Sequence, residues 1–240
     1  MRKIKNQIFL LAISIMIVSC TKEITTQTYI QTGSIVGYVT LYDENGNLIS
    51  DKSGVNISIS GWPSFDATTN GSGRFELDNV PTGTYNISFT KDGFSETKRV
   101  GYEFVGGENP VIITQVLAKP TSVIVKSISL IGDSITNEVH ANIQLSYLYN
   151  GSTGYVRLFF GLSDKVTNLN YDYTNLVTFL FGVESATALL NPNYTSGTKV
   201  YIIAYGAPNY YSSYIDINTG TTIYPSLNLN APQIASIIIH

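Results

Sequence analysis

The 240-residue sequence contains a single cysteine, Cys20, a single tryptophan, Trp62, and two histidines. With one cysteine the chain cannot form an internal disulfide framework, and it offers no set of thiolates for a metal site. Charged residues make up 13% of the chain, against about a quarter in ordinary soluble domains. Serine, threonine, asparagine and tyrosine take their place, which is a composition common in secreted β-proteins.

Basic residues are especially scarce beyond the first 19 residues. Arg2, Lys3 and Lys5 lie in that opening segment, and the remainder carries 11 Lys and Arg against 17 Asp and Glu, a net charge of −6. A nucleic-acid partner requires a basic patch that attracts phosphate groups. The charge therefore argues against nucleic acid as a partner.

The chain opens with a targeting segment. Its basic residues precede an apolar run, Ile8 to Val18, which is too short to span a bilayer. The following "IVSC" resembles the bacterial lipobox, which implies a lipoprotein signal peptide over 1–19 and lipidation of Cys20. Acyl chains there, at about 0.8 kcal/mol per buried methylene, would anchor the protein to the outer membrane of a Gram-negative envelope, on the periplasmic or the surface face. A secretory signal followed by a chance cysteine is the alternative.

Residues 20–32 lack apolar periodicity and predict a polar, lipidated tether. Beyond it, helix signals nearly vanish and short alternating segments predict strands. In "TYNISF", for example, Tyr85, Ile87 and Phe89 share one face of the expected strand. Asn45-Gly46 is a strong hairpin signal because both residues tolerate a positive φ. About seven short strands are expected before residue 119, which favours a small antiparallel β-sandwich.

An ordered series of turn and core residues supports that sandwich. The series comprises Gly37, Asn45-Gly46, Gly73-x-Phe75-x-Leu77, Val80-Pro81-x-Gly83-x-Tyr85 and Gly93-Phe94. It resembles the carboxypeptidase regulatory-like domain, a prealbumin-like fold, over residues 33–118. In that family the module is an appendage to the enzyme, and the zinc-binding His-x-x-Glu motif of the enzyme domain is missing here. The resemblance therefore implies a structural or binding role.

Lys119-Pro120-Thr121 interrupts the strand pattern and marks the expected domain boundary. Further strand-like segments follow, and residues 188–208 resemble the E–F corner and F strand of fibronectin type III domains. The corner tyrosine of that family is replaced by Val200, with Tyr201 beside it. We therefore expect a fibronectin-like or immunoglobulin-like sandwich over 121–240. The predicted fold class is all-β, with two tandem antiparallel β-sandwiches after the signal peptide and tether.

Gly132-Asp133-Ser134 resembles the first block of the GDSL esterases, in which the serine is the nucleophile. Such an enzyme requires a histidine base oriented by an aspartate, and donors for the oxyanion. His140 lies only six residues downstream on the polar face of a strand, and His240 ends the sequence without an Asp-x-x-His motif. The better interpretation is a turn at Gly132-Asp133 with no catalytic role for Ser134. We expect no enzyme activity, no metal and no cofactor.

Ser134 also belongs to a second, overlapping sequence motif. Asp133-Ser134-Ile135 fits the acceptor sequence for protein O-glycosylation in some Gram-negative bacteria, and a surface turn suits such a site. Ser134 is therefore a candidate O-glycosylation site.

Aromatic residues are the remaining candidates for binding. Trp62 and Phe65 lie between two expected strands, and Pro63 places Trp62 in a loop. Tyr210, Tyr211 and Tyr214 cluster near another loop. Rings presented from loops bind sugar faces or protein partners, although most tyrosines of a sandwich fill its cores. The expected function is extracytoplasmic binding of a glycan or an envelope protein; a passive spacer or assembly subunit is the main alternative, and a GDSL-type esterase a distant one.

Replacing Cys20 with serine tests the anchor. We expect Cys20→Ser to move the protein from the membrane to the soluble fraction, because the polar tether holds no other apolar anchor. Fractionation of cells in high salt measures this, and a variant that stays with the membrane would contradict lipidation.

Overall fold

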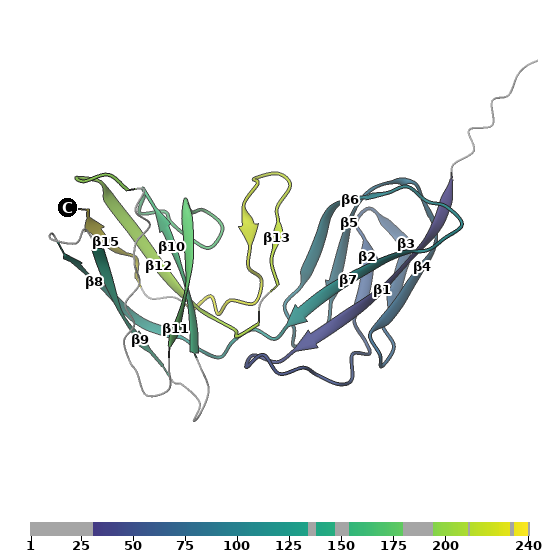
Figure 1. Ribbon diagram of the computed structural model, residues 1–240, viewed down its shortest axis with the longest axis horizontal. Helices are drawn as coiled ribbons and strands as arrows, with labels where there is room; N and C mark the ends of the chain where they lie inside the picture. Colours follow the sequence, from purple (N-terminus) through teal and green to yellow (C-terminus); the bar gives the residue numbers. More distant parts are fainter. Residues whose placement is uncertain are drawn as a thin grey trace, which may run out of the picture. The chain divides into compact units, whose positions relative to one another are not determined.

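The computed structural model describes residues 31–133, 138–146, 154–179, 194–210, 212–230 and 233–239. The regular secondary structure of these residues consists of β-strands. Figure 1 shows their order along the chain. The strands are β1 (Thr32–Tyr42), β2 (Asn56–Ile59), β3 (Trp62–Thr68), β4 (Arg74–Pro81), β5 (Gly83–Thr90), β6 (Thr97–Phe104), β7 (Val111–Ala118), β8 (Val125–Asp133), β9 (Glu138–Leu145), β10 (Gly154–Gly161), β11 (Tyr173–Phe179), β12 (Lys199–Ala207), β13 (Tyr214–Ile215), β14 (Thr222–Ile223) and β15 (Ala235–Ile238). The all-β fold class with two sandwiches is confirmed. In the described part of the chain, no helix has the length and hydropathy to cross a bilayer.

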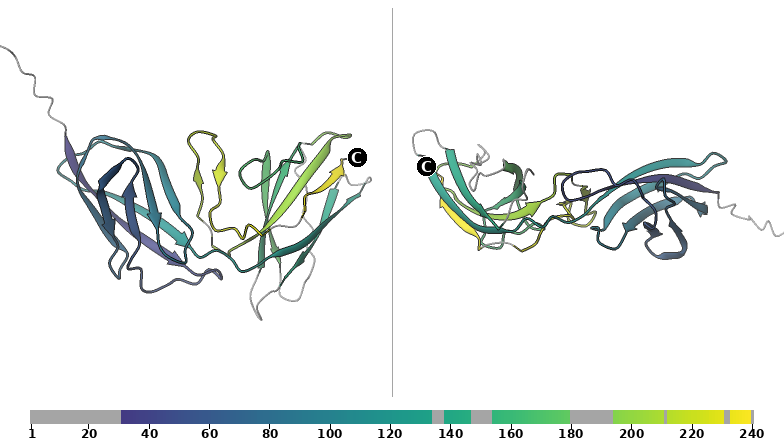
Figure 2. Two further views of the ribbon diagram at one scale, coloured as in Figure 1. Left: turned by 180° about the vertical axis from the view of Figure 1, so that it is seen from behind. Right: turned by 90° about the horizontal axis from the view of Figure 1, so that it is seen from below.

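The first sandwich consists of two sheets, β4-β1-β7 and β3-β2-β5-β6, which enclose one core (Figure 2). Alternation along β5 supplies that core, since Tyr85, Ile87 and Phe89 are buried while their neighbours face outward. Phe89 also meets Phe75 of β4 edge to face, with ring centroids 5.8 Å apart. The period of two seen in the sequence therefore corresponds to the observed burial.

One strand pair departs from the expected antiparallel arrangement. β7 runs parallel to β1, with Ile35 opposite Val111 and Tyr42 opposite Ala118. β1 and β7 are the first and last strands of this sandwich, so the chain between them supplies the long crossover that parallel pairing requires. The remaining ladders of the described residues are antiparallel.

The second sandwich is built from the sheet β11-β10-β12-β15 and the pair β8-β9. Its inner core holds side chains of β9, β10 and β12, among them Ile143, Leu158 and Val200. A second cluster covers the opposite face of the four-stranded sheet, where Phe159 and Tyr205 pack with Leu227. Strand β10 is therefore buried on both faces, which explains its nearly continuous apolar sequence.

Tyrosines concentrate in this second cluster. Phe159 makes edge contacts with Tyr171, Tyr205 and Tyr224 at centroid distances of 4.8, 5.7 and 6.1 Å. The buried guanidinium of Arg157 lies 3.8 Å from the ring centroid of Tyr224. These aromatic side chains pack together in the second cluster.

The predicted turn at Gly132-Asp133 is wrong. Both residues end β8, where Gly132 pairs with Val139 and Asp133 pairs with Glu138. Extending the ladder to these residues satisfies more of their backbone groups than a turn at the same place would. Ser134 follows and lies outside the described residues.

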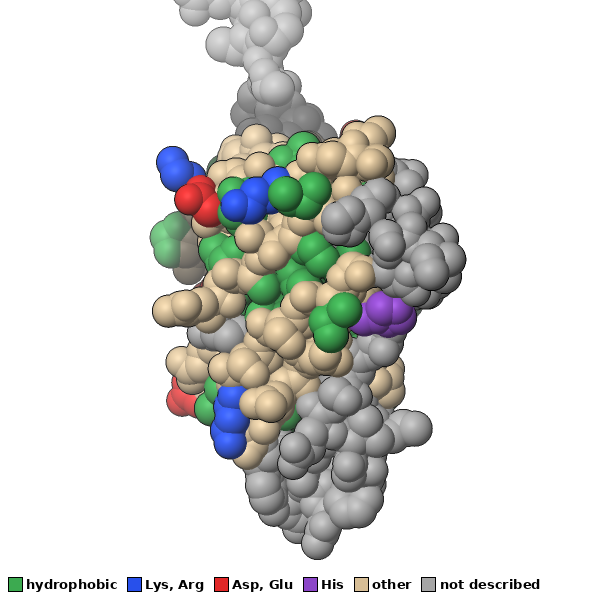
Figure 3. All heavy atoms as spheres, turned by 90° about the vertical axis from the view of Figure 1, so that its left-hand side faces the viewer, with side chains coloured by type: hydrophobic (Ala, Val, Ile, Leu, Met, Phe, Trp, Pro, Cys, Tyr) green, Lys and Arg blue, Asp and Glu red, His purple; other side chains and the backbone are tan. Residues whose placement is uncertain are grey.

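Figure 3 shows one face of the second sandwich, on which hydrophobic side chains are scattered among polar ones. Exposed apolar residues of this sandwich include Ile131, opposite His140 in the β8–β9 register, and Ile238 of β15. Scattered apolar side chains are normal on a protein surface, so this face by itself indicates no partner.

Two glycines of the first sandwich test how its turns are stabilised. Gly73 (φ +86°) and Gly93 (φ +76°) both require the left-handed region, but only at Gly73 would an added Cβ meet backbone, 2.2 Å from the carbonyl oxygen of Val39. We expect Gly93→Ala to lower the free energy of unfolding by about 1 kcal/mol. Gly73→Ala should lower it by about 2–4 kcal/mol, because steric overlap adds to the backbone strain. Urea denaturation measures both, and equal losses would contradict the observed close approach at Gly73.

Candidate functional site

Trp62 lies at the start of a strand and not in the predicted loop. It begins β3, the edge strand of the sheet β3-β2-β5-β6, where the missing N–H of Pro63 is tolerated. The indole is 47% exposed, and its centroid lies 5.9 Å from that of Phe65. Phe65 packs against the core of the first sandwich. Trp62 is thus the exposed member of the pair and Phe65 its support.

The three candidate tyrosines do not form one cluster in the described structure. Tyr210 stacks on Tyr42 of β1, with centroids 4.0 Å apart and planes 12° apart, so one face of its ring is already covered. Tyr211 lies outside the described residues, as do Cys20 and Ser134. Tyr214 is half-buried on β13 and lines a pocket. Among the candidate aromatic residues that the structure describes, only Tyr214 contributes to this pocket.

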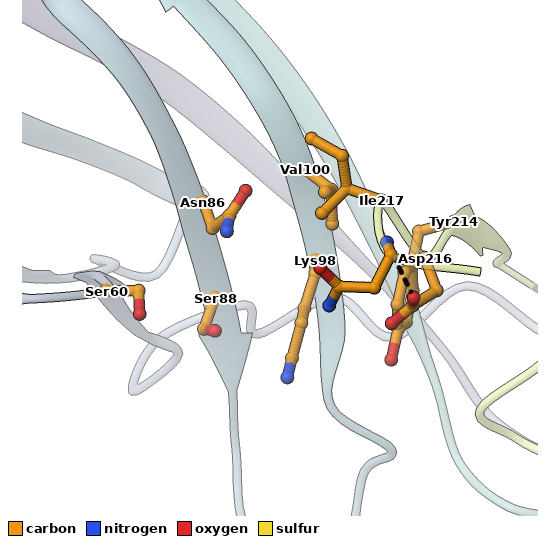
Figure 4. A pocket seen from close by; sticks show the side chains of 9 residues that line it. Ser60, Asn86, Ser88, Lys98, Val100, Tyr214, Asp216 and Ile217 are labelled. Atoms are coloured by element: carbon orange, nitrogen blue, oxygen red, sulfur yellow. Dashed lines mark hydrogen bonds between the residues drawn. The ribbon is translucent and has the colours of Figure 1, made fainter. Parts of the chain in front are cut away.

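The pocket has a volume of about 200 Å³ and lies where β5, β6 and the β13–β14 hairpin meet (Figure 4). Asn86 and Ser88 project from β5, Lys98 and Val100 from β6, and Tyr214, Asp216 and Ile217 from the hairpin; Ser60 and Asn218 complete the lining. Most of these side chains carry a hydrogen-bonding group.

The hairpin side of the pocket is fixed by a turn centred on Asp216. Its Oδ1 accepts hydrogen bonds from the backbone N–H groups of Asn218 and Thr219, both at 3.0 Å, and from the Thr219 hydroxyl at 3.2 Å. Gly220 supplies the positive φ that closes the turn. The sequence Asp-Ile-Asn-Thr-Gly-Thr is thus sufficient to explain the local hairpin.

The sheet side of the pocket is shaped by a bulge. The β5–β6 register shifts between Tyr85 and Ile87, and the Asn86 Oδ1 accepts a 2.9 Å hydrogen bond from the N–H of Gly101. A Cβ at Gly101 would lie 3.5 Å from the Ile217 side chain, so the hairpin lies against this strand. The bulge turns Asn86 toward the opening and leaves its amide NH₂ for a ligand.

Each charged side chain of the pocket interacts with a neighbouring group. Lys98 Nζ lies 3.4 Å from Glu96 Oε1. The backbone N–H of Thr219 is the largest contributor that holds the pKa of Asp216 below its ordinary value, so this carboxylate is ionised at neutral pH. Burial raises the pKa of the Tyr214 phenol, so the hydroxyl remains protonated and can both donate and accept.

The lining supports binding better than catalysis. Ser60 and Ser88 contribute hydroxyl groups, but the lining contains no histidine that could act as their base. Across the described residues, no group of three or more His, Cys, Asp or Glu side chains could hold a metal ion. The arrangement can form several hydrogen bonds to a polar ligand.

Asn86, Ser88 and Lys98 were not predicted as site residues from the sequence. They are ordinary outward-facing polar residues of strands, and only the register that places Ser88 opposite Lys98 brings them together. The residue Ser60 and the hairpin residues come from distant parts of the chain. The alternating polar residues on the outward face of β5 were the one local signal in the sequence for these pocket residues.

Residues 34–117 match the family model of the carboxypeptidase regulatory-like domain. This match covers nearly all of the first sandwich. No curated protein sequence matches the chain.

Several solved structures resemble the chain weakly. A DUF3823 family protein from Bacteroides uniformis is 14% identical with a TM-score of 0.34, over 87% of this chain and 100% of that chain. A candidate carbohydrate binding protein from the same species is 14% identical with a TM-score of 0.28, over the same shares. A cohesin–X-dockerin complex from Acetivibrio cellulolyticus is 17% identical with a TM-score of 0.31, over 37% of this chain and 58% of that chain. Similarities this low carry no inference about function.

The exposure of Trp62 can be measured directly, because it is the only tryptophan. We expect a red-shifted emission that iodide quenches readily, since the indole is 47% exposed. Trp62→Ala should lower the free energy of unfolding by less than about 1 kcal/mol, as expected for a surface substitution. A blue-shifted spectrum that resists quenching would show that the indole is buried.

Proposed function

We propose that this protein is a non-enzymatic binding module of a Gram-negative cell envelope, and that its pocket between β5, β6 and the β13–β14 hairpin binds a glycan. The observation that carries the proposal is the convergence of hydroxyl, amide, ammonium and carboxylate groups from three segments on one pocket of about 200 Å³.

The chemistry of the lining suits a sugar. Each sugar hydroxyl both donates and accepts, and the pocket offers donors such as Lys98, the acceptor Asp216 and hydroxyls that do both. Tyr214 and Ile217 add apolar surface that suits the C–H groups of a sugar ring. The volume is smaller than the roughly 300–1,000 Å³ of sites for drug-sized ligands, so one unit or one end of a glycan is the expected occupant.

Anchoring at the membrane is part of the proposal and rests on the sequence alone. The lipobox-like segment ending at Cys20 and the polar residues up to 32 would tether the module to the outer membrane. A glycan-binding module held there would retain its ligand close to the cell surface or within the periplasm.

The second sandwich is proposed to be fibronectin-like, and its strand order supports this. In immunoglobulin-like sandwiches the third, sixth and seventh strands form one sheet. The order β11-β10-β12-β15 fits that sheet with one additional edge strand. Val200 and Tyr201 belong to the clusters on opposite faces of this sheet. In the proposed function this sandwich supplies the hairpin that completes the pocket.

A protein partner at the Trp62 edge is a second candidate function. It is favoured by the exposure of the indole on an edge strand with Phe65 beneath it. If neither site binds, the passive spacer is the remaining interpretation.

Ser88 provides the most conservative test of the pocket. On an array of neutral and charged oligosaccharides we expect the wild-type protein to bind a defined subset. Ser88→Ala should weaken that binding about 3- to 10-fold, because one hydrogen bond is worth about 1 kcal/mol. Ser64→Ala is the matched control, since Ser64 is exposed on β3 outside the pocket. Titration calorimetry measures both, and equal affinity of the two variants would contradict binding at this pocket.

A further inference from the structure

The charges around the pocket do not favour an anionic ligand. Lys98 is the one cationic side chain of the lining, and its ammonium group lies 3.4 Å from the carboxylate of Glu96. Asp216 adds a second carboxylate on the hairpin side. One positive and two negative groups leave the pocket with a net negative charge.

The position of Asp216 further disfavours an anionic ligand. The hydrogen bonds from Asn218 and Thr219 to its carboxylate end on Oδ1, so Oδ2 remains able to accept from a ligand. A carboxylate that accepts from a ligand selects hydroxyl or ammonium groups and repels a second carboxylate. The turn fixes this group in place, so it cannot easily turn away from an acidic ligand.

The next cationic residue on β6 does not alter the net charge that faces the pocket. Arg99 follows Lys98 in the strand, and its guanidinium lies 5.6 Å from the ring centroid of Tyr102, a residue that packs against the core. Alternation along β6 therefore directs Arg99 away from the face that carries Lys98. Lys98 is left as the single cation facing the ligand, and Glu96 already offsets it.

We propose that the pocket selects neutral or amine-bearing glycans and discriminates against glycans with carboxylate or sulfate groups. The inference rests on the proposed function and names its ligand class. An acidic sugar would have to displace Glu96 from Lys98 and approach Asp216. A neutral sugar can donate to Asp216 and accept from Lys98 while the pair with Glu96 stays in place.

The test compares matched probes on the wild-type protein. The probes are tetrasaccharides of glucose, galactose and mannose, each with its C6-carboxylate and C6-amine derivatives. We expect a neutral or amine form to bind at least about 3-fold more tightly than its carboxylate form, the size of effect expected for one partly screened charge. Tightest binding of a carboxylate form would overturn this inference and leave the proposed function intact. Absence of binding to all forms would overturn the proposed function and this inference with it.

A variant that removes the charge of Glu96 shows whether the selectivity arises from the Lys98–Glu96 ion pair. Glu96→Gln removes the partner of Lys98 without touching the lining, and should strengthen binding of the carboxylate forms about 3-fold or more while neutral forms change less than about 2-fold. Glu108→Gln is the control, since it changes the net charge equally at an exposed loop residue. If both variants shift the carboxylate forms equally, or neither does, the local balance at Lys98 is not the cause of the selectivity.

Discussion

The alternation of side chains along β5 is the constraint on which this molecule depends. Tyr85, Ile87 and Phe89 point inward and hold the two sheets of the first sandwich together, and the residues between them must then face outward. Asn86 and Ser88 occupy that outward face and line the pocket. One strand therefore stabilises the core and presents a polar surface, and a register slip of one residue would exchange the two faces.

A polar strand face becomes a pocket only when another segment covers part of it. The β13–β14 hairpin does so, with Ile217 against Gly101 and the Asp216 turn fixing its tip. The hairpin is held to the second sandwich by a 2.8 Å hydrogen bond from the Tyr171 hydroxyl to the carbonyl oxygen of Thr222. The proposed function assigns this hairpin a role in binding.

The sequence was sufficient to predict the parts of this molecule that depend on local periodicity. The alternation in "TYNISF" and the turn at Asn45-Gly46 predicted an all-β fold, and the strands expected before residue 119 are observed as β1 to β7. The parallel pairing of β7 with β1 could not be predicted, since strand order depends on contacts between distant residues. For the same reason the pocket was missed: Ser88 and Lys98 become neighbours only through the β5–β6 register. Trp62 was correctly singled out as exposed, but an edge strand tolerates the Pro63 that had suggested a loop.

Glycan binding at the pocket is tested by mapping the residues that respond to a bound glycan. In a ¹⁵N-labelled sample titrated with a tetrasaccharide that binds on the array, we expect amide shift changes concentrated at Asn86, Ser88, Lys98 and residues 216–218. Unchanged amides at these positions, with changes confined to the neighbourhood of Trp62, would contradict binding at the pocket. A spectrum without changes at saturating tetrasaccharide would contradict glycan binding altogether.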